Sequence, residues 1–259
     1  MVRDHLGTQN KNGILGLTVE VGKISNLYHF TGQRIMKETV VITGASFGVG
    51  KATAQLLASS GFNVIAIARN IEELNKIASQ DIEVYEVDIT KKDQVEAFGR
   101  SMVGKNIVAL INNAGGGFNL PNSILDDDIE NWKKSFDLNV TGTAHVTKVI
   151  APIMVENGGG NVVIITSMAG KDVYRGGSSY TVAKHAEVAL SEILRLELFQ
   201  HNIRVTEIAP GNINSRGDRD SGNCLEAEDV AEAIRWSIMV PKHVNVESIS
   251  IMHVNNLNR

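Results

Sequence analysis

The stretch Thr43-Gly44-Ala45-Ser46-Phe47-Gly48-Val49-Gly50 follows a short apolar run at residues 40–42 and precedes a polar-apolar segment at residues 51–58. A short apolar run bounded by glycine predicts a buried strand, and the segment after it is typical of a helix. Glycines at such a junction let a phosphate approach the backbone, and the positive end of the helix faces that anion. The stretch alone fits either a dinucleotide-binding turn or a simple tight turn.

Past residue 38 the chain alternates between predicted strands and predicted helices. We expect strands at residues 40–42, 63–68, 82–87, 107–111, 161–165, 203–208 and 247–252. We expect helices at residues 51–58, 71–79, 129–156, 178–199 and 226–239, and one that begins near Thr90 and Asp93. The helix at 178–199 is expected to be apolar at Ala183, Ala186, Leu190 and Leu194. This alternation predicts a single-domain Rossmann-type α/β fold, in which helices cover both faces of a doubly wound parallel sheet.

Composition and charge narrow the functional classes. The chain has 259 residues, 43% of them hydrophobic, and a formal net charge of -4, so we expect no basic surface that recruits nucleic acid or anionic lipid. One cysteine, Cys224, excludes an internal disulfide, and no apolar run approaches the roughly 20 residues that span a bilayer. Scattered histidines give no metal-ligand spacing, so no metal site is predicted. We expect a cytoplasmic protein without nucleic-acid or membrane partners.

Residues 1–35 differ from the rest because they show no sustained hydrophobic period. We interpret them as an N-terminal extension that precedes a dinucleotide-binding domain at residues 36–259. Two interpretations stay open for this segment. Met36 can be the natural start, with an appended segment before it, or the extension can be a genuine part of the protein that packs on the domain.

Polar and glycine residues follow most of the predicted strands. Ligands of doubly wound sheets bind at the carboxyl ends of the strands, so these residues are candidates for a binding site. Thr43-Gly-x-x-x-Gly-x-Gly50, Asn112-Asn-Ala-Gly115, Asn139, Ser167, Tyr180-x-x-x-Lys184 and Pro210-Gly211 occur in this order along the chain. In order and spacing they resemble the short-chain dehydrogenase/reductase family, over residues 36–254. Each motif alone is weak, but the ordered combination is strong.

Tyr180 and Lys184 are four residues apart, so a helix places both side chains on one face. An ammonium near a phenol favours the phenolate and lowers the phenol pKa from its usual value of about 10. Tyr180 can then donate or accept a proton at a substrate oxygen. An isolated pair would more often be an exposed helix pair, but Ser167 after the neighbouring strand favours catalysis. No Gly-x-Ser-x-Gly motif surrounds Ser167, which argues against a hydrolase.

The resemblance implies further roles for these residues. It implies that Tyr180 is the acid/base, that Ser167 orients the substrate oxygen and that Asn139 holds a water in a proton relay. Lys184 would also bond the nicotinamide ribose. The cofactor-binding residues that we expect are Gly44, Ala45, Ser46, Phe47, Gly48, Val49, Gly50, Arg69, Asn70, Asp88, Ile89, Asn113, Ala114, Gly115, Tyr180, Lys184, Pro210, Gly211, Ile213 and Ser215.

Arg69 at the end of the second predicted strand decides the cofactor. An acidic residue there would accept the ribose hydroxyls of NAD, whereas a guanidinium suits the 2′-phosphate of NADP. A solvated arginine at a strand end is the alternative. Phe47 stands where NADP enzymes of the family often have a basic residue, which weakens this prediction slightly. We therefore expect NADP, with NAD as the less favoured cofactor.

Substrate and assembly follow from the resemblance only. The C-terminal segment resembles the branch of NADP-dependent 3-hydroxy acid (serine-type) dehydrogenases, so the implied substrate is a small alcohol or carbonyl compound, with a 3-hydroxy acid as one option. The loop 212–224 is shorter than in that branch, and its Arg216 and Arg219 fit either carboxylate binding or a solvated loop. A general carbonyl reductase and a catalytically silent nucleotide-binding or sensing protein are the alternatives. A homodimer or homotetramer is expected.

Overall fold

The structure, a computed structural model, describes residues 37–118, 120, 123–215 and 222–256. The chain divides into the units Met1–Met36 and Lys37–Arg259, and every described helix and strand lies in the second unit. The predicted N-terminal extension at residues 1–35 lies outside the described residues, as do Arg216 and Arg219 of the predicted substrate loop. These predictions therefore stay predictions.

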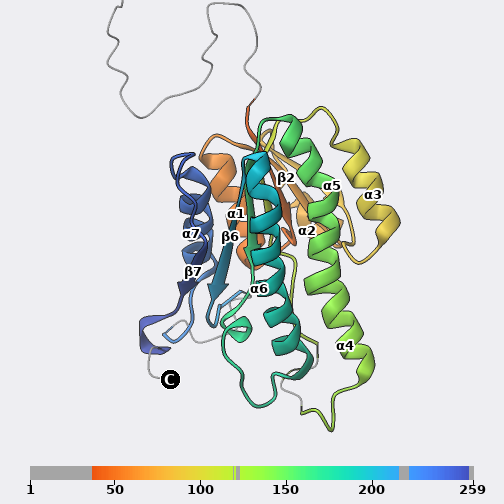
Figure 1. The fold of residues 1–259 in the computed structure, drawn as a ribbon, viewed down its shortest axis with the longest axis vertical. Helices are drawn as coiled ribbons and strands as arrows, with labels where there is room; N and C mark the ends of the chain where they lie inside the picture. The colour runs from red at the N-terminus through yellow and green to blue at the C-terminus, as the bar shows by residue number, and fades with distance from the viewer. Residues whose placement is uncertain (1–36, 119, 121–122, 216–221, 257–259) are drawn as a thin grey trace, which may run out of the picture. The chain divides into compact units, whose positions relative to one another are not determined.

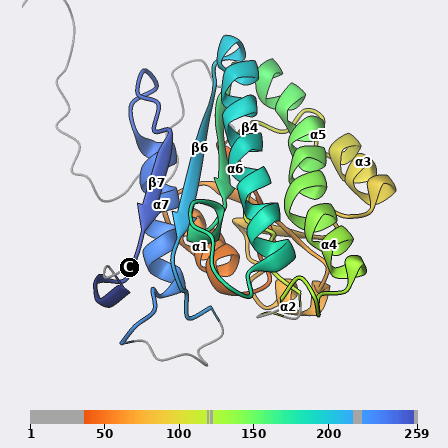
Figure 2. The same cartoon turned by 60° about the horizontal axis from the view of Figure 1, so that its bottom comes forward.

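A parallel sheet of seven strands forms the centre of the described domain (Figures 1 and 2). The strands are β1 Thr39–Thr43, β2 Asn63–Ala68, β3 Ile82–Glu86, β4 Ile107–Asn112, β5 Gly160–Ile165, β6 Ile203–Pro210 and β7 Ser248–Ile251. Their order in the sheet is β3-β2-β1-β4-β5-β6-β7, and all neighbouring pairs are parallel. The strand order reverses at β1 and β4, and ligands of such sheets bind at this point.

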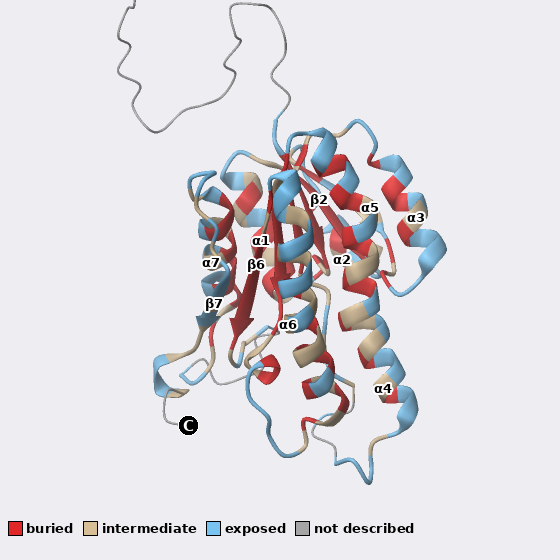
Figure 3. Ribbon diagram, in the orientation of Figure 1, coloured by how far each residue is buried: buried red, intermediate tan, exposed pale blue. Residues whose placement is uncertain are grey.

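Helices cover both faces of the sheet, because parallel strands with apolar residues on both sides must be buried on both sides. The helices are α1 Gly48–Ser59, α2 Ile71–Asn75, α3 Lys92–Ser101, α4 Ile129–Phe136, α5 Thr143–Glu156, α6 Ser178–Leu198 and α7 Ala227–Met239. One core joins Ile42 of β1 to residues of α1 and α7, and the other joins Val41 to residues of α3 and α5. The five inner strands β2, β1, β4, β5 and β6 are almost wholly buried, whereas the edge strands β3 and β7 are partly exposed (Figure 3). The predicted doubly wound Rossmann-type fold is confirmed.

Most predicted elements are present, with shifted ends. The bounds of β2 match the prediction, and the Asn70 side chain caps α2 by accepting from the Glu73 N–H at 3.0 Å. Helix α2 ends at Asn75 and not near Ser79, because Ser79 instead forms a bridge with Ile82. Thr90 does not cap α3, which begins at Lys92, since its hydroxyl donates to Asp88 at 2.8 Å.

The residues predicted to form one helix at 129–156 form three segments. A π-helical turn at Asp137–Gly142 separates α4 from α5. A π turn bonds each N–H five residues back, so it adds one residue to the turn and rotates the side chains around it. Asn139, one of the predicted catalytic residues, lies in this turn.

Helix α6 presents a polar face to the interior. Its buried residues are Ser179, Thr181, Ala183, Lys184, Glu187 and Ser191. Of the apolar positions predicted for this helix, only Ala183 is fully buried, and the other three are half-buried. None of the described helices is both long enough and apolar enough to cross a membrane.

Candidate active site

A cavity of about 1250 Å³ lies at the carboxyl ends of the central strands. It contains most of the predicted site residues, namely Gly44, Ser46, Phe47, Gly48, Val49, Arg69, Asn70, Asp88, Ile89, Asn113, Ala114, Gly115, Ser167, Tyr180, Lys184, Pro210, Gly211, Ile213 and Ser215. Three others, Ala45, Gly50 and Asn139, are buried and do not line it. The structure thus brings the predicted catalytic and cofactor residues to one edge of the sheet.

Thr43 and Asn113 fix the glycine turn between β1 and α1. The Thr43 hydroxyl oxygen accepts from the N–H groups of Asn113 and Ala114 at 3.0 and 2.9 Å. In return the Asn113 amide donates to the carbonyl oxygens of Thr43 and Gly44 at 2.9 and 3.1 Å. Gly44 has φ +66°, where a side chain is strained, and a Cβ on it would lie 2.8 Å from the Ala114 Cα. The turn therefore requires glycine and is locked to the end of β4.

Gly50 in the first turn of α1 provides a test of this packing. A Cβ at this position would clash with the Gly44 carbonyl oxygen and lie 2.9 Å from the Ala45 Cα. Because these neighbours are backbone atoms, Gly50→Ala must displace the turn, and we expect a loss of about 1–3 kcal/mol in the free energy of unfolding. Denaturant unfolding measures the loss. Gln55→Ala on the exposed side of the same helix is the control, and equal stability of the two variants would contradict the close packing.

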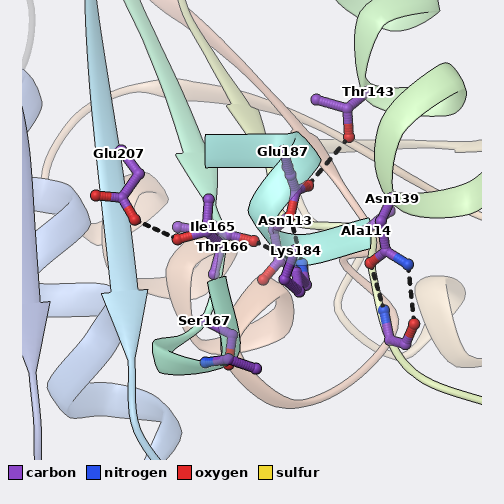
Figure 4. Close-up of polar contacts among 12 residues, drawn as sticks. Asn113, Ala114, Asn139, Thr143, Ile165, Thr166, Ser167, Lys184, Glu187 and Glu207 are labelled. Atoms are coloured by element: carbon purple, nitrogen blue, oxygen red, sulfur yellow. Dashed lines mark hydrogen bonds and ion pairs between the residues drawn. The ribbon is translucent and has the colours of Figure 1, made fainter. Parts of the chain in front are cut away.

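Ser167, Tyr180 and Lys184 line the same cavity from two elements. Ser167 lies two residues after the end of β5, and its Oγ accepts from the Ala169 N–H at 3.1 Å, which leaves the hydroxyl proton available to a ligand. Tyr180 and Lys184 lie one turn apart on α6, and the Lys184 Nζ is 5.9 Å from the centre of the Tyr180 ring. Figure 4 shows Ser167 and Lys184 in this region. The arrangement can bind a substrate oxygen and exchange a proton with it.

Asn139 has a supporting position. The Asn139 side chain, labelled in Figure 4, is fully buried. Its Oδ1 accepts from the Gly116 N–H at 3.0 Å, and its Nδ2 donates to the carbonyl oxygens of Gly116 and Ser135 at 2.9 and 2.8 Å. These bonds hold the glycine segment after β4 in place. The side-chain amide is engaged in this way, and the predicted role of Asn139 in holding a water stays a prediction.

Glu187 is a charged residue that the sequence analysis did not single out. The Lys184 Nζ donates to its Oε2 at 2.6 Å, and both side chains are almost completely buried (Figure 4). Burial by itself lowers the pKa of Lys184, but the Glu187 carboxylate and the Tyr180 phenol together outweigh burial, and the pKa is raised above its ordinary value. The lysine therefore stays an ammonium ion inside the protein.

Arg69 and Asn70 lie exposed at the end of β2 and line the cavity. Glu73 also lines it, but its carboxylate pairs with Lys76 at 2.6 Å. Asp88 after β3 is held by Thr90, whose N–H donates to it at 3.0 Å. This part of the lining combines a guanidinium with hydrogen-bonding groups.

Other lining residues were missed from the sequence, and they include Glu73, Leu120, Leu138, Met168, Asp172, Tyr174, Met252 and Asn256. A signal existed for Asp172 and Tyr174, because they lie in the loop between Ser167 and Tyr180. Within the residues that the structure describes, no group of three or more His, Cys, Asp or Glu side chains is placed to hold a metal ion.

Comparison with known proteins decides the family. The family model described as short chain dehydrogenase matches residues 38–223, which include the glycine turn, Ser167, Tyr180 and Lys184. The chain belongs to the short-chain dehydrogenase family. It is therefore an oxidoreductase, and the predicted family resemblance is confirmed.

Relatives of this short-chain dehydrogenase share nearly the whole domain. An uncharacterized oxidoreductase of Mycobacterium tuberculosis is 39% identical over 230 residues, which cover 83% of this chain and 90% of the relative. The crystal structure of serine dehydrogenase from Escherichia coli is 29% identical with a TM-score of 0.77, and covers 84% of this chain and 98% of its own. A closed form of serine dehydrogenase complexed with NADP+ is 28% identical to this chain with a TM-score of 0.78. The match covers 84% of this chain and 95% of the serine dehydrogenase chain.

Short-chain dehydrogenases bind a nicotinamide cofactor, and the residues of this chain fit such a group. Gly44 and Gly48, with φ +66° and +52°, line the cavity without side chains of their own, so a pyrophosphate can approach the backbone at these two positions. A Cβ on Gly115 would lie 2.9 Å from the Lys184 Nζ, so glycine at this position keeps the lysine accessible from the cavity. Both observations agree with a dinucleotide laid across the strand ends.

Proposed function

We propose that this protein catalyses reversible hydride transfer between NADP(H) and a small alcohol or carbonyl compound. The observation that carries the proposal is that Ser167, Tyr180 and Lys184 share one cavity with the glycine turn. A phosphate-binding turn alone would support only a nucleotide-binding protein. A phenol, a hydroxyl and a buried ammonium beside it are what a proton transfer at a substrate oxygen requires.

Ser167, Tyr180 and Lys184 have different roles in the proposed reaction. The chemistry that nicotinamide supplies when bound is hydride transfer. Ser167 donates a hydrogen bond to the substrate oxygen, and Tyr180 gives that oxygen a proton in reduction or takes it in oxidation. The Lys184 ammonium stabilises the phenolate that Tyr180 becomes, and it would also donate a hydrogen bond to the cofactor ribose.

NADP is the proposed cofactor because of Arg69. This guanidinium lines the cavity at the end of β2, where a 2′-phosphate of the adenine ribose would lie. Gly44, Ser46, Phe47, Gly48 and Val49 would hold the pyrophosphate and the adjacent ribose. Serine dehydrogenase complexed with NADP+, which this chain resembles, supports the choice.

Small 3-hydroxy acids are the substrates to test first, because the solved serine dehydrogenases resemble this chain over 84% of its length. The cavity lining also includes the Asp172 carboxyl and the apolar Leu120 and Met168. A general carbonyl reductase would use such a lining for neutral compounds. The substrate panel should therefore contain both acids and neutral carbonyl compounds.

A spectrophotometric screen tests the proposed function. NADPH oxidation is measured with a panel of keto acids, aldehydes and ketones, and NADP+ reduction with the corresponding alcohols. We expect turnover with at least one compound, and faster turnover with NADPH than with NADH. If the protein binds NADPH but oxidises it with no member of the panel, the alternative of a silent nucleotide-binding or sensing protein gains support.

The homodimer or homotetramer implied by the family stays a prediction, which light scattering would check.

A further inference from the structure

An acidic residue lies behind the proposed catalytic lysine. Glu187 is on α6, three residues after Lys184, and its side chain is 1% exposed. Its Oε2 accepts from the Lys184 Nζ at 2.6 Å, and its Oε1 accepts from the Thr143 hydroxyl of α5 at 3.4 Å. A buried charge destabilises the folded protein unless it is paired. Glu187 has no role in the reaction as proposed above.

The pair fixes the direction of the lysine. An ammonium has three protons to donate. One goes to Glu187, and a second goes to the carbonyl oxygen of Ile165 at the end of β5, at 3.1 Å (Figure 4). Lys184 also lines the cavity, so the third proton is available on the side of Tyr180 and the cofactor. Glu187 and Ile165 thus hold the ammonium from behind.

The Glu187 carboxylate acts electrostatically on Lys184. Tyr180 and Lys184 share its helix, and Glu207 of β6 is the other buried acid whose charge acts on Glu187. Glu207 is compensated separately, because Lys171 pairs with it at 3.0 Å. It also accepts hydrogen bonds from the hydroxyls of Thr166 and Ser248. Among the described residues, Glu187 is therefore the acid in direct contact with Lys184.

We propose that Glu187 is a positioning residue, which orients the Lys184 ammonium toward the cavity and sets the pH at which Tyr180 gives up its proton. The inference rests on the proposed function, because it assigns Tyr180 and Lys184 their roles. A negative charge behind the ammonium offsets part of the positive potential at the phenol. Without this charge, the coupled lysine and tyrosine would release a proton at lower pH.

Glu187→Gln tests the proposal, because the amide keeps the shape and loses the charge. We expect the pH midpoint of the rising limb of alcohol oxidation to move down by about one pH unit or more, the size of shift that neighbouring charges produce. Glu187→Asp keeps the charge, so its midpoint should stay within about half a unit of the wild-type value. If Glu187 served only packing, both variants would lose thermal stability and neither would move the midpoint. That result would overturn the proposal.

Glu207→Gln is the matched control, because it also neutralises a buried glutamate, but one without contact to Lys184. We expect a lower unfolding temperature and an unchanged pH midpoint. A shift in this control as large as that of Glu187→Gln would show a general charge effect and would overturn a specific role of Glu187. If Glu187→Gln does not fold, Glu187→Ala carries the same expectation for the midpoint.

A second measurement separates this proposal from the proposed function. The ionisation of Tyr180 is followed without substrate, as the ultraviolet phenolate absorbance of each protein minus that of the same protein with Tyr180→Phe. The phenolate should form at lower pH in Glu187→Gln than in the wild type. If no compound is turned over but this shift is present, the proposed function fails and the role of Glu187 stands. If compounds are turned over and neither the absorbance nor the rate profile shifts, only the role of Glu187 fails.

Discussion

Tyr180→Phe is expected to lower kcat for carbonyl reduction by about 10²–10⁴-fold, the usual contribution of a positioned acid or base. The phenyl ring fills the same volume but carries no proton for the substrate oxygen. Binding of NADPH should change by less than about threefold, because the glycine turn and Arg69 that are proposed to hold the cofactor stay in place. Steady-state kinetics and fluorescence titration with NADPH measure the two quantities separately.

Tyr85→Phe provides the control for this substitution. Tyr85 lies on β3, outside the cavity lining, where its hydroxyl donates to Glu83 and its ring packs edge-on against Phe98 with centroids 5.6 Å apart. The same chemical change at this position should leave kcat unaltered. Activity of Tyr180→Phe equal to that of Tyr85→Phe would refute the acid/base role of Tyr180.

The glycine turn, the strands and the Tyr180–Lys184 pair could be predicted because their signals are local. The bounds of β2 follow from six consecutive residues, and the cap of α2 follows from Asn70 and Glu73. The gathering of these residues at one edge also follows, since parallel strands end on the same side of a sheet. Such features need no knowledge of distant contacts.

Two features were not predicted from the sequence, and only the first of them needed the tertiary structure. In the π turn at Asp137–Gly142 each hydrogen bond spans five residues, one more than in an α-helix. The pattern of apolar residues does not reveal this difference. The π turn decides where Asn139 points. The paired acid Glu187 had a signal, because it is four residues after Ala183 and three before Leu190, on the side predicted to be buried. An acid at such a position predicts a buried partner, and Lys184 was the nearest cation on that side.

Arg69→Ala is expected to raise the KM for NADP by about 10–100-fold and the KM for NAD by less than about threefold. The reason is that a charge-assisted hydrogen bond to phosphate contributes about 1.5–3 kcal/mol, while NAD has no 2′-phosphate to lose. Arg69→Asp should go further, since an acid at the end of β2 repels the phosphate and can accept hydrogen bonds from the ribose hydroxyls of NAD. Initial rates at varied concentrations of each cofactor give both constants.

The neighbours of Arg69 make this test specific. Glu73 in the same lining is paired with Lys76, so removal of the arginine does not leave that acid without a cation. Phe47 is 54% exposed at the position where a second basic residue would be expected, so Arg69 is the cation that we propose to bind the 2′-phosphate. Arg100→Ala at the exposed end of α3 removes the same charge away from the cavity, and it should change neither KM. Equal increases of both KM values in Arg69→Ala would mean that the guanidinium supports the site as a whole, and the argument for NADP would fail.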